Sequence, residues 1–192
     1  MLVSELNHRV KNTLAVVLGL ASQTLATVSG PDAFEHAFID RVQALARAHD
    51  LLTRADWVST SLAEVVHHAL SPYGMERFAI GGPRVMLMPR AAVILTLAFN
   101  ELATNATKYG ALSEPGGQVA VKWHEQAQGI ELLWQECGGP PVVSPTRRGF
   151  GSRLVEQMIA YEVDGDSELA FAPEGVTCRM RFPINSKGLV GA

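Results

Sequence analysis

The stretch that decides the fold is AVILTLAFNELATNATKYG, residues 92–110. It contains no charged residue before Glu101, and Pro89 lies just ahead of it. Proline is tolerated in the first turn of a helix, and a glycine such as Gly110 commonly ends one. The pattern therefore predicts a long apolar helix over residues 89–109.

Three polar side chains interrupt this apolar helix at helical spacing. Glu101, Asn105 and Lys108 follow one another at steps of four and three, so they share one stripe. A carboxylate and an amide oxygen suit Mg²⁺, and an ammonium group suits a polyphosphate. The alternative is a solvated helix edge on which a glutamate and a lysine happen to meet.

Two amphipathic runs precede this domain. Apolar residues recur at three-and-four spacing over residues 3–28, and again over residues 34–52. Ser-Gly-Pro-Asp at 29–32 separates the runs, because glycine ends helices and proline begins them. We expect an antiparallel helical hairpin whose apolar stripe meets a second hairpin or the rest of the chain. His49 belongs to this stripe and is expected to pack in the core.

His8 is the one histidine of the first run, and its position differs from that of the apolar stripe. It lies two residues from Leu6, which is about 200° around a helix, so it should face solvent. An exposed neutral imidazole is nucleophilic and could accept a phosphoryl group. The alternative is an ordinary surface histidine.

Short elements with turn signals between them surround the long helix. Their order predicts an α/β sandwich, in which helices cover one face of a mixed sheet. A loose tail is expected over residues 187–192. The predicted helices are 62–70 and 152–161, and the predicted strands are 78–82, 85–88, 118–124, 130–136, 168–172 and 176–182.

Two glycine-rich segments could also bind a ligand. In WQECGGPP, residues 134–141, Glu136 ends an apolar strand and could accept a hydrogen bond from an exocyclic amine such as that of adenine. In RRGFGS, residues 147–152, glycines open a helix whose free N–H groups could bind phosphate. The alternatives are a tight turn for the first segment and a plain loop-to-helix joint for the second.

Composition excludes some classes of protein. The net charge is −3, whereas a nucleic-acid binder needs a basic face. No apolar run approaches the roughly 20 residues that cross a bilayer, and the first residues lack an export signal. We therefore expect a cytoplasmic protein without a transmembrane segment. Cys137 and Cys178 make no metal-ligand pattern, and each is expected to be a buried or half-buried free thiol.

Taken together, four motifs resemble those of the HWE histidine kinases, a branch of the GHKL ATPase superfamily. ELNHRVKNTLAVV at 5–17 is similar to the phosphoacceptor box, and NELATNATKYGALS at 100–113 to the ATP-binding N box. LLWQECGGPPV at 132–142 resembles the Trp-x-Glu box, and RRGFGSRLVE at 147–156 the glycine box. The likeness covers nearly the whole chain.

The resemblance implies an α+β protein with three parts. Residues 1–60 would be a dimerisation and phosphoacceptor hairpin of the four-helix-bundle type, and residues 61–185 a GHKL (Bergerat) ATP-binding sandwich. Residues 186–192 would be a flexible tail. The resemblance also assigns roles: His8 as phosphoacceptor, Asn105 and Glu101 as direct and water-mediated Mg²⁺ ligands, and Lys108, Tyr109, Glu136, Gly138, Gly149, Gly151 and Thr177 as further ATP-binding residues.

The implied activity is that of a two-component kinase. It would move the γ-phosphate of ATP, with Mg²⁺, onto His8 and then to an Asp of a response-regulator receiver domain. A homodimer through the hairpin, and a sensory domain upstream or in a partner, are further implications. One departure is Asn100, which stands where most members carry histidine and cannot take a proton near neutral pH. The alternative function is a phosphotransfer adaptor that does not bind ATP.

Overall fold

The computed structural model describes residues 2–54, 58–127, 129–142, 159, 164–183 and 189–190. The chain divides into two compact units, Met1–Gln43 and Ala44–Ala192. The division lies inside the second helix, whereas the sequence pattern suggests a boundary near residue 60.

The first unit is built from helix α1 (Leu2–Thr27) and the first part of helix α2 (Pro31–Arg54). Gly30 connects them with φ +92°, a conformation that favours glycine. Buried Arg41 donates from Nη1 to Thr24 Oγ1 at 2.9 Å, which joins the two helices as the predicted hairpin requires. Two side chains of the apolar stripe of α1 are nevertheless exposed to solvent. Val10 is 48% and Leu14 56% exposed.

The second unit contains the end of α2 and, among the described residues, two complete α-helices. These are α3 (Leu62–Leu70) and α4 (Pro89–Tyr109), both with the predicted bounds. Ser61 caps α3, because its hydroxyl accepts from the Glu64 N–H at 3.2 Å while Glu64 Oε2 accepts from the Ser61 N–H at 2.9 Å. In α4 every residue from Ala91 to Ala103 is buried. The apolar sequence of α4 thus makes it the core helix of this unit. Short 3-10 turns lie at Ser71–Tyr73 (η1), Met75–Arg77 (η2) and Ala111–Ser113 (η3).

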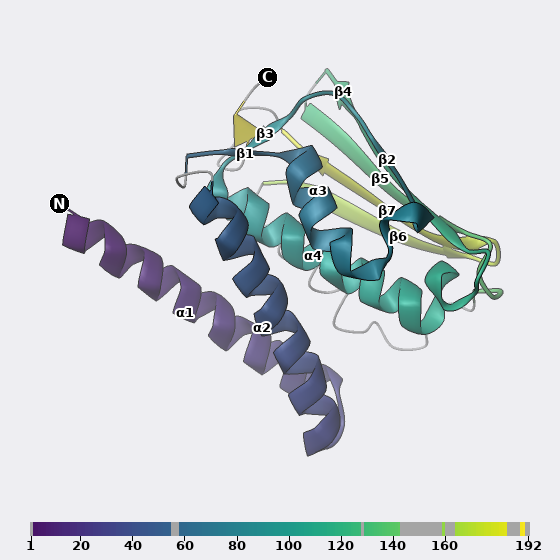
Figure 1. Ribbon diagram of the computed structural model, residues 1–192, viewed down its shortest axis with the longest axis horizontal. Coiled ribbons are helices and arrows are strands. Elements are labelled where there is room, and N and C mark those ends of the chain that lie inside the picture. The colour runs from purple at the N-terminus through teal and green to yellow at the C-terminus, as the bar shows by residue number, and fades with distance from the viewer. Residues whose placement is uncertain are drawn as a thin grey trace. The chain divides into compact units, whose positions relative to one another are not determined.

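A five-stranded mixed sheet forms the other layer of the second unit. Its order is β2-β4-β5-β7-β6, in which β2 and β4 are parallel and the other pairs antiparallel. Figure 1 shows α3 and α4 on one face of this sheet, which confirms the predicted α/β sandwich. The strands are β2 (Phe78–Gly81), β4 (Gln118–Gln126), β5 (Gly129–Cys137), β6 (Asp166–Ala172) and β7 (Gly175–Phe182).

Alternate side chains divide this sheet into a buried and an open face. Trp134, Leu132 and Met180 are fully buried on the helix side. On the open side Glu131 lies between Arg179 and Arg181, with Arg181 Nε 3.0 Å from Glu131 Oε2. The ion pairs on the open face and the apolar core on the other explain why this sheet carries helices on one side.

A second, smaller sheet contains β1 (Thr60–Ser61), β3 (Met86–Leu87) and β8 (Leu189–Val190) in the order β1-β3-β8. We predicted a loose tail over residues 187–192, but Leu189 and Val190 pair with β3, whose edge offers unpaired backbone groups. The predicted helix 152–161 lies outside the described residues except for Ile159, which is helical. Within the described part of the chain, no helix is long and apolar enough to cross a bilayer.

The cap of α3 gives a first prediction. Ser61→Ala removes the hydroxyl that accepts from Glu64 N–H, so the free energy of unfolding should fall by about 1 kcal/mol. Urea denaturation monitored by circular dichroism measures this change. Ser22→Ala, on an exposed position of α1, is the control and should change little, because alanine favours helix. Equal stability of Ser61→Ala and wild type would contradict the role of the cap.

Candidate functional site

The polar stripe of α4 runs from the core to the surface at the carboxyl end of the helix. Glu101 is only 6% exposed, whereas Asn105 and Lys108 are exposed. Tyr109, the last residue of α4, is 74% exposed. A buried carboxylate thus lies about one turn before an accessible amide and about two turns before an accessible ammonium group. This gradient differs from a solvated helix edge, on which the glutamate would also be exposed.

Glu136 lies near the end of β5 and joins it to the end of α4. The side chain is 5% exposed, and its Oε2 accepts from the Ala111 N–H at 2.9 Å. Its Oε1 accepts from the indole Nε1–H of Trp134 at 3.1 Å. Residues two apart on a strand share a face, which explains why a Trp-x-Glu sequence brings the indole to the carboxylate.

The same surroundings change the acidity of Glu136. Burial raises the pKa of the carboxyl group above its ordinary value of 4.5, and the hydrogen bonds from Ala111 and Trp134 oppose this rise. Burial disfavours the ionised form, and N–H donors stabilise it. The N–H groups of Ala111 and Trp134 therefore favour the ionised form of Glu136, whereas burial favours its neutral form.

Glycines allow the chain to close tightly around Glu136 and Ala111. A Cβ on Gly110 would collide with Glu136 Oε2, and a Cβ on Gly139 would lie 2.6 Å from Ala111 Cα. Gly138 has φ +73°, a region that favours glycine. The glycines after Glu136 are thus required for backbone packing between the end of β5 and the end of α4.

Arg77, at the end of η2, also fixes the loop after α4, because its guanidinium group donates to backbone carbonyls of that loop. Its Nη1 donates to Leu112 O at 3.0 Å, and its Nε and Nη2 donate to Gly117 O at 3.0 and 2.8 Å. The Nη2 also donates to the carbonyls of Ala111 and Glu114. Sequence reasoning missed Arg77, since a lone arginine before a short strand carries no local signal for contacts 34 to 40 residues away.

Asn100, the residue that replaces the expected histidine, is 3% exposed. Its Oδ1 accepts from Arg47 Nη2 at 2.8 Å and from the Tyr73 hydroxyl at 2.9 Å. An amide oxygen has two lone pairs, so both are used. Neither Arg47 nor Tyr73 stands out in the sequence, because their contacts with Asn100 are long-range.

Of the other predicted site residues, one lies on the opposite face of the sheet, two lie outside the described residues and one belongs to the first unit. Thr177 pairs with Gln135 across β5 and β7, so it lies on the open face of the sheet, opposite Glu136. Gly149 and Gly151 lie outside the described residues. His8 belongs to α1 in the first unit, and its side chain lies outside the described part.

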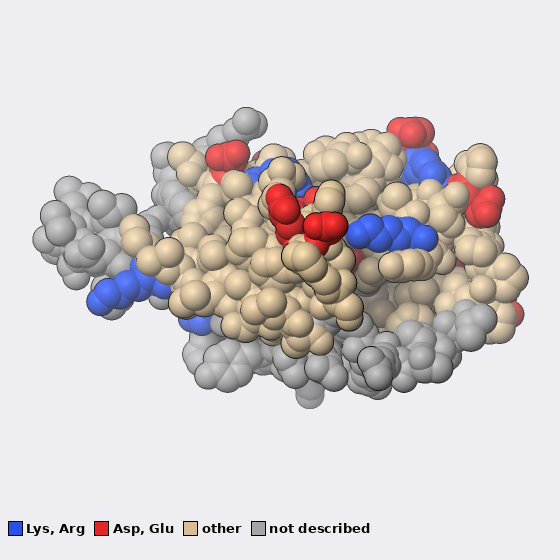
Figure 2. All heavy atoms as spheres, turned by 90° about the horizontal axis from the view of Figure 1, so that it is seen from below, with Lys and Arg blue, Asp and Glu red and all other residues tan. Residues whose placement is uncertain are grey.

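Both cysteines are free thiols, as predicted. Cys178 is buried, as expected, but Cys137 is exposed, so the predicted burial is wrong for Cys137, which ends β5. Figure 2 shows Lys and Arg in small groups separated by uncharged surface, with Asp and Glu near several of them. Among the described residues of that face, Lys and Arg form no extended basic patch.

The donor set of α4 fits a magnesium ion that is shared with a phosphate ligand. Glu101 and Asn105 offer hard oxygen atoms one turn apart. Among the described residues, no group of three or more His, Cys, Asp or Glu side chains could hold a metal. Mg²⁺ needs few protein ligands, because it keeps several waters and binds substrate phosphates.

The raised pKa of Glu136 gives a second prediction. The folded chain holds the Glu136 proton more tightly than the unfolded chain does, so this stabilising contribution is full below about pH 4.5 and is lost as pH rises through the folded pKa. Unfolding of wild type and Glu136→Gln in urea from pH 4.5 to 8 measures it. The stability of wild type relative to the variant should fall with rising pH. If the stability of wild type relative to Glu136→Gln stays constant or increases with rising pH, burial does not dominate the pKa of Glu136.

Comparisons with known proteins identify the family. Residues 5–84 match the family model described as HWE histidine kinase. A blue-light-activated histidine kinase of Brucella anthropi is 37% identical over 193 residues, which cover 97% of this chain and 39% of that protein. The corresponding kinase of Brucella abortus is 35% identical over 194 residues. The chain spans about two fifths of the curated relatives that it matches.

Solved structures show the same fold. A blue-light activated histidine kinase of Erythrobacter litoralis superposes with a TM-score of 0.67 at 15% identity, covering 93% of this chain and 60% of that one. The catalytic domain of the histidine kinase ThkA matches with a TM-score of 0.52 at 15% identity, covering 66% of this chain and 95% of that one. With its N box, its Trp-x-Glu box and its GHKL sandwich, the chain belongs to the HWE histidine kinase family.

Proposed function

We propose that this chain is the transmitter core of a two-component histidine kinase, which transfers the γ-phosphate of ATP to His8. The observation that carries the proposal is the stripe on α4, where buried Glu101 leads to exposed Asn105 and Lys108. It lies in the same unit as Glu136 and the glycines after it, the second segment expected to bind a nucleotide. Membership of the family supports the same conclusion.

Each residue of the stripe would have a separate role. Asn105 would ligate Mg²⁺ through its amide oxygen, and Glu101 would hold a metal-bound water. Lys108 would face the phosphates and Tyr109 would lie beside the nucleotide, while Glu136 would recognise the adenine amine. When bound, magnesium supplies charge neutralisation to the phosphates, and phosphoryl transfer depends mainly on such charge stabilisation and on positioning.

His8 would be the nucleophile. A neutral ring nitrogen attacks the γ-phosphorus, the bond between that phosphorus and the β–γ bridging oxygen breaks, and ADP leaves while the imidazole loses its proton. The phosphoryl group would then pass to an aspartate of a response-regulator receiver domain. His8 belongs to the first unit and the stripe to the second. The first transfer therefore requires His8 and the γ-phosphate to be brought into line, within one chain or between two copies.

A second copy of the chain is the proposed partner of the hairpin. Val10, Leu14, Leu18 and Leu25 of α1 are between 48% and 68% exposed. An exposed apolar stripe at helical spacing is typical of an interface, and a four-helix bundle of two hairpins would bury it. The signal itself would come from a sensory domain, either upstream or in a partner protein.

A labelling experiment tests the proposal. With γ-labelled ATP and Mg²⁺, wild type should acquire acid-labile, alkali-stable label, as expected for phosphohistidine. His8→Ala should lose the label because its nucleophile is gone, and Asn105→Ala should lose it because a metal ligand is gone. The controls are His67→Ala, an exposed histidine of α3, and Thr107→Ala, an exposed neighbour on α4, and both should keep the label.

The same experiment separates kinase from adaptor. Wild type that takes no label from ATP, but takes it on His8 from a phosphorylated receiver domain, would contradict the kinase and support the adaptor. Label that persists in His8→Ala would contradict His8 as the acceptor.

A further inference from the structure

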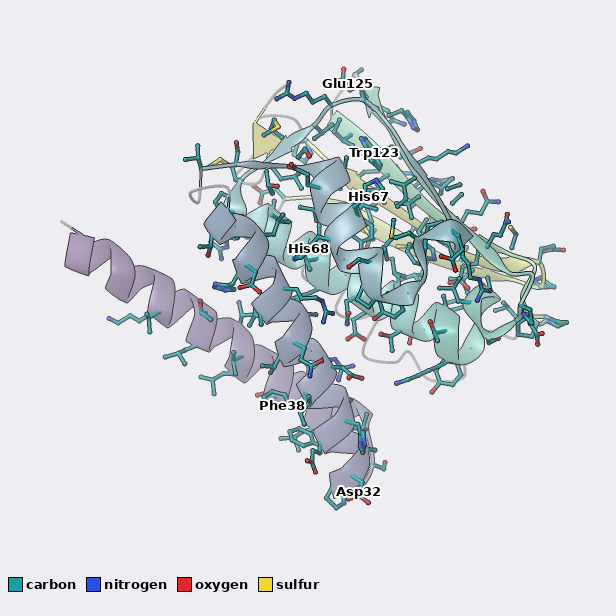
Figure 3. The ribbon with its side chains drawn as sticks, viewed as in Figure 1. Asp32, Phe38, His67, His68, Trp123 and Glu125 are labelled. Carbon is teal, nitrogen blue, oxygen red and sulfur yellow. The ribbon has the colours of Figure 1, made fainter. Side chains whose placement is uncertain are left out.

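A polar cluster on α4 connects four elements of the second unit. Asn100 and Thr104 of α4 contact Tyr73 of η1, and Asn100 also contacts Arg47 in the last part of α2. The carbonyl oxygen of Arg47 in turn accepts from His68 Nε2 of α3 at 2.9 Å. Figure 3 labels His68 on α3. We call Arg47, Tyr73, Asn100 and Thr104 the α4 clasp.

The hydrogen bonds of the clasp fit one assignment of protons. The Tyr73 hydroxyl has one proton. Its oxygen lies 2.9 Å from both Asn100 Oδ1 and Thr104 Oγ1. Because the amide oxygen can only accept, Tyr73 donates to Asn100 and accepts from Thr104. Arg47 Nη2 supplies the second donor to Asn100 Oδ1 at 2.8 Å. Two donors thus converge on one oxygen atom.

This convergence explains why an amide occupies position 100. A neutral imidazole there could accept only one of the two bonds, and a protonated one could accept neither and would face the Arg47 cation. A carbonyl oxygen accepts both. Asn100, in place of the expected histidine, therefore provides the acceptor that the Arg47 and Tyr73 donors require. This role needs no proton transfer.

The clasp holds the residues that directly precede the two proposed metal ligands. Asn100 precedes Glu101 and Thr104 precedes Asn105, and the two clasp positions are one helical turn apart. A helix held at two points one turn apart cannot rotate about its axis. We propose that Arg47 and Tyr73 are positioning residues, which set the rotation of α4 and so aim Glu101 and Asn105 at the magnesium-bound phosphates.

The environment of Arg47 argues against a purely stabilising role. Its Nε is buried and, among the described residues, has no hydrogen-bond partner. Its bond to Asn100 is to a neutral group. A buried donor without a partner reduces stability, so a cation in this place is better explained by orientation than by stability. This inference rests on the proposed kinase function and adds positioning residues to it.

Kinetics of autophosphorylation at saturating Mg-ATP test the clasp in the full chain. Arg47→Met and Tyr73→Phe each remove one donor to Asn100 and should lower the saturating rate about tenfold. Nucleotide affinity by equilibrium dialysis should stay within about twofold, because Arg47 and Tyr73 are not among the proposed nucleotide or magnesium ligands. Arg47→Lys keeps a cationic donor and should recover part of the rate. Arg84→Met, an exposed arginine outside the clasp, is the matched control and should match wild type.

The outcomes are distinguishable. Unchanged rates in Arg47→Met and Tyr73→Phe, or rates that fall only in proportion to nucleotide affinity or to the fraction folded, would overturn the positioning role and leave the kinase intact. Wild type without any label would refute the kinase itself. In that case amide hydrogen exchange over residues 97–109 tests whether the clasp holds α4. Exchange must be faster in Arg47→Met and Tyr73→Phe than in wild type and Arg84→Met. Unchanged exchange would overturn it.

Discussion

The hydrogen bond from the Ala111 N–H to the buried Glu136 carboxylate is the contact on which the second unit depends. It ties the end of the core helix to the end of a central strand, and both groups are withdrawn from water. A buried carboxylate is costly unless its oxygens have donors, and here Trp134 supplies the second one. Gly110 is needed because a Cβ there would collide with this carboxylate, and Gly139 because a Cβ there would collide with the Ala111 backbone.

The position of the α4 stripe follows from this contact. Glu136 accepts from the Ala111 N–H, and Arg77 donates to the Ala111 carbonyl oxygen. These two hydrogen bonds fix the end of α4 beside β5. The α4 clasp adds a second point of attachment, further toward the core. Asn105 and Lys108 therefore extend from a helix that is held at both its carboxyl end and its middle. Rigid support of this kind is what a site needs when catalysis depends on positioning.

Local signals in the sequence were enough for most of the fold. The proline, the glycine and the uninterrupted apolar run predicted α4 with its observed bounds, and turn signals between short segments located each strand of the five-stranded sheet. The stripe on α4 was predicted because helical spacing is local. The burial of Glu101 within that stripe was not, because it depends on what packs against the helix.

Contacts between distant segments could not be read from the sequence. Arg77 and the clasp join residues 27 to 53 positions apart, and nothing in the local pattern of either partner reveals the other. Thr177 shows a different limit: adjacent residues of a strand face opposite sides, so a likeness in sequence that locates a residue on β7 does not give its face. The division inside α2 has a similar origin, since Arg47 and its long-range bonds belong to the second unit.

Calorimetric titration of the purified chain with ATP and with ADP, in the presence of Mg²⁺, tests the central claim most directly. A site built on Asn105, Lys108 and Glu136 predicts saturable heat with one nucleotide per chain and a dissociation constant below about 1 mM, the usual range for such substrates. The heat should shrink strongly when Mg²⁺ is removed. A chain that gives no binding heat with either nucleotide would contradict the claim that α4 holds a magnesium-bound nucleotide.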